Sequence, residues 1–278
     1  MIKKFYKLEG LGNDFVLFDC LKESFSLTPR QIQRICQRRF GVGADGILLV
    51  LTSTQSSADY QMRIFNADGS EAEMCGNGIR AFAHYLYFAG LEEKNRIAIQ
   101  TLAGIIMVER KSFGMYKVAM GRAEFSPEKI PILRSQPMID EKLSISGCDF
   151  QASAVSMGNP HCVIFVDDVN NIPLSRLGPE IEHHKLFPNR TNVEFVQVIS
   201  PDYLKVRVWE RGAGETLACG TGACAVVAVA CRLNKARSPA KVLLPGGELE
   251  IEYTGDECFL TGPARLVYKG EVELENFN

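Results

Sequence analysis

The sequence lacks the features that mark secreted, nucleic-acid-binding and membrane proteins. Its 278 residues balance 31 Lys and Arg against 33 Asp and Glu, with no run of five like charges, so neither nucleic acid nor an acidic membrane is an indicated partner. The most apolar stretch, residues 223–231, is far shorter than the roughly 20 residues that span a bilayer. The first residues show no apolar signal region, so we expect a cytoplasmic protein.

Cysteine and histidine do not occur in the patterns of a disulfide framework or a zinc site. Nine cysteines, an odd number, without a secretory signal argue for reduced thiols. No Cys-x-x-Cys pair occurs, and the four histidines are not spaced with cysteines as zinc ligands, so no metal is predicted. Five cysteines lie in apolar runs and are expected to be core residues: Cys20, Cys162, Cys224, Cys231 and Cys258.

What the sequence does contain is an internal duplication. Residues 63–81 and 207–225 align without a gap at an offset of 144, and six of the nineteen positions are identical. Both copies carry Cys-Gly-x-Gly at the same place, directly before an apolar stretch. The duplication predicts a pseudo-twofold protein in which each half supplies one cysteine at the start of a helix. The identical pairs are Arg63 with Arg207, Glu71 with Glu215, Cys75 with Cys219, Gly76 with Gly220, Gly78 with Gly222, and Ala81 with Ala225.

The periodicity predicts helices at residues 29–40, 76–89, 175–184 and 220–233. The first has Thr28 as N-cap, Pro29 at its first position, and an apolar stripe. Strands are expected in the first half at residues 3–8, 14–20, 47–51, 60–66, 96–102, 105–110 and 115–120. In the second half they are expected at residues 143–145, 152–157, 162–166, 193–199, 204–209, 241–244, 248–253 and 258–260. A last strand is expected at residues 264–274.

The two helices that follow the cysteines are apolar around almost their whole circumference, so each must be buried on all sides. Because the other elements of each half are mostly strands, a curved sheet around one central helix is the simplest cover. We therefore predict an α+β fold of two pseudo-symmetric domains, each a barrel-like mixed or antiparallel sheet around a central helix. The predicted domains are residues 1–119, to which 264–278 return, and residues 120–263, with the helix starts meeting at the cleft between them.

The start of a helix favours anions, because its first N–H groups lack partners and the dipole places positive charge there. The glycines after Cys75 and Cys219 let an anion approach the backbone closely, and the same field is expected to lower the pKa of both thiols by roughly one unit. One thiolate and one thiol on opposite sides of an amino-acid Cα–H could invert its configuration. The N–H groups would meanwhile stabilise charge that develops on the carboxylate.

Polar residues at turns before the strands and cysteines are candidates for holding the rest of a substrate. A Gly-Asn pair precedes a strand in both halves, at Asn13 and Asn159. Turn capping is an alternative role for any one of these asparagines. Together with a Glu-Arg pair, they form a set suited to a second ammonium and carboxylate: Asn66, Asn192, Glu210 and Arg211.

The sequence resembles diaminopimelate epimerases, cofactor-independent enzymes that interconvert LL- and meso-2,6-diaminopimelate on the route to lysine and peptidoglycan. The resemblance runs nearly end to end. It rests on residues 12–15 (Gly-Asn-Asp-Phe), 65–70 (Phe-Asn-Ala-Asp-Gly-Ser), 74–80 (Met-Cys-Gly-Asn-Gly-Ile-Arg), 157–161 (Met-Gly-Asn-Pro-His), 191–194 (Thr-Asn-Val-Glu) and 210–223.

The resemblance implies the family's two-domain fold, no cofactor, diaminopimelate as substrate, and a possible homodimer. It implies Cys75 and Cys219 as the acid/base pair, assisted by His161 and Glu210. It implies that the reacting carboxylate is held by Gly76, Asn77, Gly220 and Thr221. The rest of the substrate would be held by Asn13, Asn66, Asn159, Asn192, Glu210 and Arg211.

One position departs from the family pattern, and other functions stay open. Some family members have a substrate-contacting glutamine where this sequence has Gly46, so that contact is not carried over. A proline racemase or hydroxyproline epimerase is an alternative, although these typically place His where Asn77 stands. A two-domain amino-acid-binding protein, or a thiol-disulfide protein, is an alternative from another class. His84 on the apolar helix is expected to be a hydrogen-bonded core residue.

Overall fold

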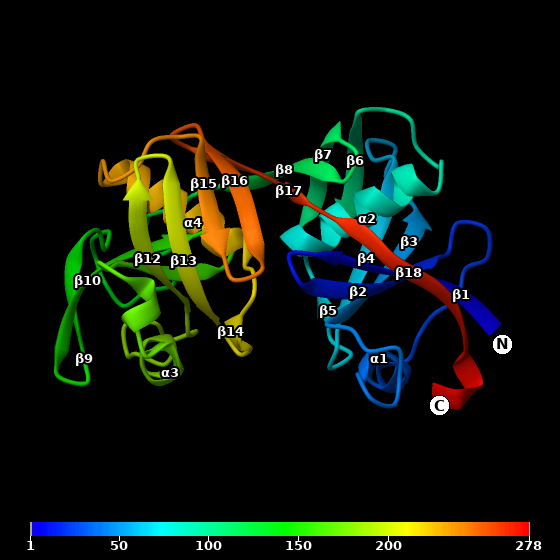
Figure 1. Cartoon of the computed structure of the whole chain (residues 1–278), viewed down its shortest axis with the longest axis horizontal. Coiled ribbons are helices and arrows are strands. Elements are labelled where there is room, and N and C mark those ends of the chain that lie inside the picture. The colour runs from blue at the N-terminus through cyan, green and yellow to red at the C-terminus, as the bar shows by residue number, and fades with distance from the viewer. Residues whose placement is uncertain (1, 278) are drawn as a thin grey trace. The chain divides into compact units, whose positions relative to one another are not determined.

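The computed structural model describes residues 2–277, which form two compact units (Figure 1). The first unit comprises Met1–Val118 and Gly262–Asn278, and the second is Ala119–Thr261. Each unit is built from strands around one long helix. Within residues 2–277, no helix is both long and apolar enough to cross a membrane.

The first unit contains a mixed sheet in which all pairings are antiparallel except β2–β3 and β4–β6. The last strand of the chain pairs with the first, from Ile2↔Glu273 to Glu9↔Arg265. In spatial order the strands are β18 (Arg265–Glu273), β1 (Ile2–Gly10), β2 (Asn13–Asp19), β3 (Gly46–Thr52), β4 (Tyr60–Asn66), β6 (Arg96–Thr101), β7 (Gly104–Ser112) and β8 (Met115–Arg122), with β5 (Glu71–Ala72) beside β4.

The second unit repeats this order and these directions. Its pairings are antiparallel except β11–β12 and β13–β15, which take the places of β2–β3 and β4–β6. The duplication in the sequence is therefore a duplication of topology. In spatial order the strands are β9 (Glu141–Ile145), β10 (Cys148–Ser156), β11 (Pro160–Phe165), β12 (Asn192–Ser200), β13 (Tyr203–Glu210), β15 (Ala240–Leu244), β16 (Gly247–Tyr253) and β17 (Glu257–Pro263), with β14 (Gly214–Thr216) beside β13.

Each sheet curves around one buried helix, as the apolar sequences predict. In the first unit α2 (Gly76–Phe88) packs against β1, β2, β3, β4 and β18, and every residue from Gly76 to Leu86 is buried. In the second, α4 (Gly220–Arg232) packs against β10, β11, β12 and β16 and is buried from Gly222 to Ala230. His84 on α2 is buried, with Nδ1 3.0 Å from the Tyr116 hydroxyl, which confirms its predicted place in the core.

Short helices cover the other face of each sheet. In α1 (Pro29–Cys36) the Thr28 cap, Pro29 and the buried apolar stripe are confirmed, but the predicted extension to residue 40 is wrong. The carbonyls of Ile35 and Cys36 accept instead from the N–H groups of Gly43 and Ala44, so the loop folds back over the helix end. In the second unit α3 (Leu174–Glu182) lies within two residues of its predicted bounds. Two short 3₁₀ turns complete the list, η1 (Val169–Asn171) and η2 (Leu274–Phe277).

The predicted strands are present with ends that differ by at most four residues, but β5 and β14 were expected only as turns. Strands of two and three residues are too short to show an alternating pattern. Ion pairs pin both to the neighbouring strand: Arg63 Nε lies 2.7 Å from Glu71 Oε1, and Arg207 Nε lies 2.8 Å from Glu215 Oε1. Two of the duplicated identities therefore hold the hairpins that lead to the cysteines.

Candidate active site

Cys75 and Cys219 occupy the same position in their units, the N-cap of the central helix. Both have extended backbone angles, at φ −143° and φ −119°. Each sulfur accepts a hydrogen bond from the third helical residue, at 3.4 Å from the Gly78 nitrogen and 3.4 Å from the Gly222 nitrogen. The remaining N–H groups of the first turn point out of the helix start, so each unit offers an anion-binding helix end beside a sulfur atom.

In the first unit, the structure brings Asn13 and Asn77 to the Cys75 sulfur. Asn13 Oδ1 lies 3.7 Å from Cys75 Sγ and 3.3 Å from Asn77 Nδ2. Asn66 is exposed at the end of β4, where its amide donates to Ser70 Oγ at 3.0 Å. Asn13, Cys75 and Asn77 therefore form one cluster, whereas the Asn66 amide is bonded to Ser70.

A charged network fixes the Asn13 side chain. Asn13 Nδ2 donates to Asp45 Oδ2 at 3.1 Å, and Asp45 also lies 2.6 Å from Arg38. Asp14 accepts from Arg38 at 2.8 and 3.0 Å and pairs with buried Lys7 at 2.7 Å. Burial opposes ionisation of Asp14, but these hydrogen bonds outweigh it and hold its pKa well below the usual range.

Arg80 ends the 74–80 motif, but the sequence analysis assigned it no role. It is fully buried and donates to the Gly76 carbonyl at 2.9 Å, to Asn77 Oδ1 at 2.9 Å and to the Pro263 carbonyl at 3.2 Å. An arginine on an apolar helix was the available signal, since such a charge is seldom buried without fixed acceptors. Arg80 braces the turn that carries the predicted carboxylate-binding N–H groups.

In the second unit, the structure brings His161, Asn159 and Thr221 to Cys219. His161 Nε2 lies 2.9 Å from Asn159 Oδ1, and Asn159 Nδ2 lies 3.5 Å from Thr221 Oγ1. Thr221 Oγ1 lies in turn 3.4 Å from Cys219 Sγ. The predicted residues therefore form a polar chain that ends at the sulfur.

Glu194 is a further residue that the sequence prediction did not assign a role. It is fully buried on β12, and its Oε1 lies 2.7 Å from His161 Nδ1. Gly222 lies against it, because an added Cβ there would meet Glu194 Oε1 at 2.8 Å and Cys219 Sγ at 3.3 Å. A carboxylate between the apolar residues Val193 and Phe195 was the signal that could have identified it.

Burial controls the acid/base groups around Cys219. It raises the pKa of Glu210, and the nearby Glu194 charge adds to this, while the Thr216 hydroxyl donates to Glu210 and opposes it. Burial also raises the pKa of the Cys219 thiol well above its ordinary value, and Glu210 and Glu194 raise it further. The expectation that the helix start would lower this pKa is wrong for Cys219, because desolvation and two carboxylates outweigh the helix N–H groups.

Asn192 and Arg211 lie together beside this cluster. Asn192 Oδ1 accepts from the Arg211 backbone at 2.9 Å, and its Nδ2 donates to the Pro160 carbonyl at 2.8 Å. The Arg211 side chain is exposed and reaches the Asn189 carbonyl at 3.1 Å. Asn192 thus braces the turn that carries Glu210 and Arg211.

Gly46 heads β3, and its neighbours explain why this chain has no side chain there. An added Cβ would lie 2.5 Å from the Phe65 carbonyl oxygen, so any larger residue requires the backbone to shift. Among residues 2–277, no group of three or more His, Cys, Asp and Glu side chains is arranged to hold a metal ion.

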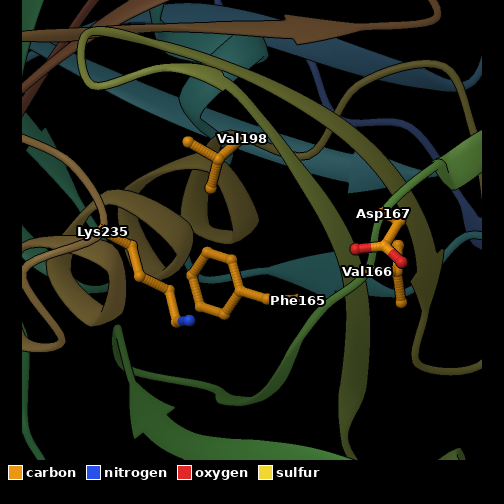
Figure 2. Close-up of a pocket in the computed structure, with 5 residues that line it drawn as sticks. All are labelled: Phe165, Val166, Asp167, Val198 and Lys235. Atoms are coloured by element: carbon orange, nitrogen blue, oxygen red, sulfur yellow. The ribbon is translucent and has the colours of Figure 1, made fainter.

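A separate pocket in the second unit contains none of the candidate site residues (Figure 2). Lys235, which follows α4, lies over the Phe165 ring at 5.3 Å. Cys219 caps the other end of this 13-residue helix, roughly 20 Å away at 1.5 Å per residue. The pocket is lined by Phe165, Val166, Asp167, Val198 and Lys235.

The sequence matches the family described as "Diaminopimelate epimerase" over residues 5–126 and 153–267. The chain belongs to the diaminopimelate epimerase family. It is 47% identical to the diaminopimelate epimerase of Moorella thermoacetica, covering 98% of this chain and 99% of the relative. It is 48% identical to that of Synechocystis, covering 99% and 100%.

Solved structures of other proteins show the same fold. A PhzF-family phenazine biosynthesis protein from Bacillus anthracis superposes with a TM-score of 0.70 at 18% identity, covering 98% of this chain and 99% of that one. A hydroxyproline epimerase from Agrobacterium vitis superposes with a TM-score of 0.69 at 13% identity, covering 98% and 92%. The α+β fold with duplicated units is therefore the diaminopimelate epimerase-like fold, as predicted, and the family makes the protein an isomerase.

Proposed function

We propose that this epimerase interconverts LL- and meso-2,6-diaminopimelate without a cofactor, by a two-base proton transfer at one α-carbon. Cys75 and Cys219 act in turn, one as thiolate that removes the proton and the other as thiol that delivers a proton to the opposite face. The observation that carries this proposal is the identical N-cap position of the two cysteines, within a chain nearly half identical to named diaminopimelate epimerases.

The helix starts can stabilise the negative charge that forms when a thiolate removes the α-proton. An amino-acid Cα–H is a very weak acid, so its removal needs stabilisation of the charge that moves onto the carboxylate. In the proposal the N–H groups of Gly76, Asn77, Gly220 and Thr221 bind that carboxylate. Asn13, Asn66, Asn159, Asn192 and Arg211 bind the non-reacting end, while His161 and Glu210 assist proton transfer.

The burial of Cys219 fits this chemistry. A raised pKa keeps Cys219 protonated as a thiol, and it makes the Cys219 thiolate a stronger base once the proton has left. Exclusion of water at the helix start also strengthens the hydrogen bonds that stabilise the transition state. A place in lysine and peptidoglycan precursor synthesis follows from the proposed substrate. A homodimer and a cytoplasmic location stay predictions.

Incubation with LL-diaminopimelate in deuterated water tests the proposal. We expect the meso isomer to appear with one deuterium at a single α-carbon, measured by NMR and chiral chromatography. Turnover of proline or hydroxyproline alone would replace the proposed substrate, and binding of diaminopimelate without exchange would overturn the epimerase mechanism.

Mild oxidation tests whether both thiols share one carbon. Two thiols that flank a single α-carbon could form a disulfide, so we expect loss of activity on oxidation, recovery with reductant, and a Cys75–Cys219 crosslinked peptide by mass spectrometry. An unaffected, uncrosslinked enzyme would count against the shared carbon. Cys148→Ser is the control, because this cysteine is exposed and begins β10 instead of a helix.

A further inference from the structure

The second unit contains a buried ionisable pair, His161 and Glu194, directly below the Cys219 turn. Both side chains are fully buried, and Nδ1 and Oε1 are 2.7 Å apart. The other oxygen, Glu194 Oε2, is buried without a hydrogen-bond partner in the described structure. Burying a carboxylate costs free energy unless a partner compensates its charge, so packing alone does not explain this pair.

The first unit has an apolar pair at the same place. The parallel register sets His161 opposite Asn192 on β11 and β12, and Phe15 opposite Gly46 on β2 and β3. Two residues further along the second strand of each pair stand Glu194 and Leu48. Both approach the third helical residue: Leu48 Cδ2 lies 3.5 Å from a Cβ added at Gly78, and Glu194 Oε1 lies 2.8 Å from one added at Gly222.

This equivalence indicates that the fold does not need an ionisable pair at this place. Phe15 and Leu48 are almost fully buried and fill the same space with apolar side chains. Replacement of a buried ion pair by apolar residues of similar volume is often neutral or stabilising. The pair in the second unit therefore serves the chemistry of that unit.

The hydrogen bonds indicate where the protons lie. Both ring nitrogens of His161 face oxygen acceptors, Glu194 Oε1 at 2.7 Å and Asn159 Oδ1 at 2.9 Å. A carboxylate is a stronger acceptor than an amide oxygen, so a neutral His161 ring keeps its proton on Nδ1. Nε2 becomes the ring atom that gains or loses a proton, on the side that leads through Asn159 and Thr221 to Cys219.

We propose that Glu194 is a positioning residue that keeps the proton of His161 on Nδ1 and so directs Nε2 toward the Cys219 side of the proposed active site. The proposal rests on the two-base function above and deepens it. Glu194 touches no substrate in this role, since it acts through His161. The Cys75 half has no counterpart, because Phe15 and Leu48 cannot carry a proton.

Other charged or titratable groups face this pair. Glu210 on β13 interacts electrostatically with both members, and Cys219 on α4 interacts with Glu194. Burial raises the pKa of Cys162, the residue that follows His161, and Glu194 raises it further.

Nitrogen-15 NMR of the histidine rings tests the tautomer directly. The chain has only four histidines, so a His161→Phe variant assigns the resonances of His161. We expect the neutral ring of the wild type to be the Nδ1–H tautomer. In Glu194→Leu, which copies Leu48, we expect a switch to the Nε2–H tautomer. An Nε2–H tautomer in the wild type, or no change in Glu194→Leu, would overturn the proposal.

Kinetics of a double-mutant cycle test whether Glu194 acts through His161. We expect Glu194→Leu to lower kcat by about 10- to 100-fold with KM within about threefold, and Glu194→Gln to lose less, since its amide oxygen can still accept from Nδ1. In the His161→Phe background, Glu194→Leu should cause no further loss. A full additional loss there would show that Glu194 acts independently of the imidazole.

Controls separate this proposal from loss of fold and from failure of the proposed function. Leu48→Met is a volume-conserving change at the equivalent buried position of the first unit, and we expect kcat within about twofold of wild type. His161→Phe with Glu194→Leu reproduces the apolar pair, so its circular dichroism and melting curve should stay cooperative. A wild type that does not epimerise diaminopimelate would refute the proposed function, whereas the NMR tautomer would still report on Glu194.

Discussion

The two units place a cysteine on the same helix start but surround it differently. Around Cys75 the nearby groups are amides and a buried arginine that bonds to carbonyls, with Phe15 and Leu48 beneath. Around Cys219 they are an imidazole and two carboxylates, His161, Glu194 and Glu210. The backbone was duplicated, and the electrostatics diverged. In the proposed mechanism the Cys219 half therefore supplies titratable groups next to its sulfur, whereas the Cys75 half supplies amides that are held by Arg80 and by the Asp14 network.

The largest effect should come from removing either sulfur. Cys75→Ser and Cys219→Ser should each lower kcat by about 100- to 10,000-fold, because a serine hydroxyl is far too weak an acid to supply a matched base. The comparison predicts that both are needed despite their different surroundings. Steady-state epimerisation measures this, with thermal unfolding to verify the fold. Near-normal activity in either variant would refute the two-base assignment, and Cys148→Ser should behave as wild type.

Arg80 offers the next largest effect, and it sharpens the comparison because the duplicated position in the second unit is Cys224. Arg80→Met should reduce the free energy of unfolding by about 2 to 4 kcal/mol, since it removes the guanidinium hydrogen bonds to the Gly76 carbonyl, Asn77 Oδ1 and the Pro263 carbonyl. Urea denaturation gives this value. Cys224→Ala, at the matched position, should cost clearly less, and equal losses would contradict the bracing role.

The Asp14 network should make the first unit sensitive to acid. The folded-state pKa of Asp14 lies below its ordinary value, so its contribution is present above about pH 4 and is lost as the pH falls toward the folded value. Asp14→Asn should cost about 2 kcal/mol at pH 7 and remove part of the stability loss between pH 4 and pH 2. Melting temperatures across this range test the effect. A variant with the same acid sensitivity as wild type would contradict it.

The smallest expected effect is at Gly46, the position equivalent to Asn192. Gly46→Ala should cost about 1 to 2 kcal/mol, because its Cβ would press on the Phe65 carbonyl at 2.5 Å. Differential scanning calorimetry measures the loss. Asn192→Ala is the comparison at the second unit, where it removes two hydrogen bonds instead of adding a clash. An unchanged melting temperature for Gly46→Ala would show that the Phe65 carbonyl on β4 can shift at little cost in free energy.

Much of the fold could be predicted because its signals are local. The Thr28 cap, the Cys-Gly-x-Gly helix starts and the all-round apolar helices depend on residues within a turn or two of one another. The wrongly predicted end of α1 also has a local cause. The α1 end was misplaced because loop residues Gly43 and Ala44 take the last carbonyls, a competition that no periodic pattern records.

The sequence by itself determined the duplication, the two buried helices and the place of a cysteine at each helix start, because propensity, capping and apolar patterning act over short distances. Only the tertiary structure decided which polar groups surround each sulfur. His161 and Glu194 are 33 residues apart and meet through the parallel register of β11 and β12, and Arg80 reaches Pro263 across 183 residues. Such pairings depend on how the strands align, and strand alignment is a property of the whole sheet.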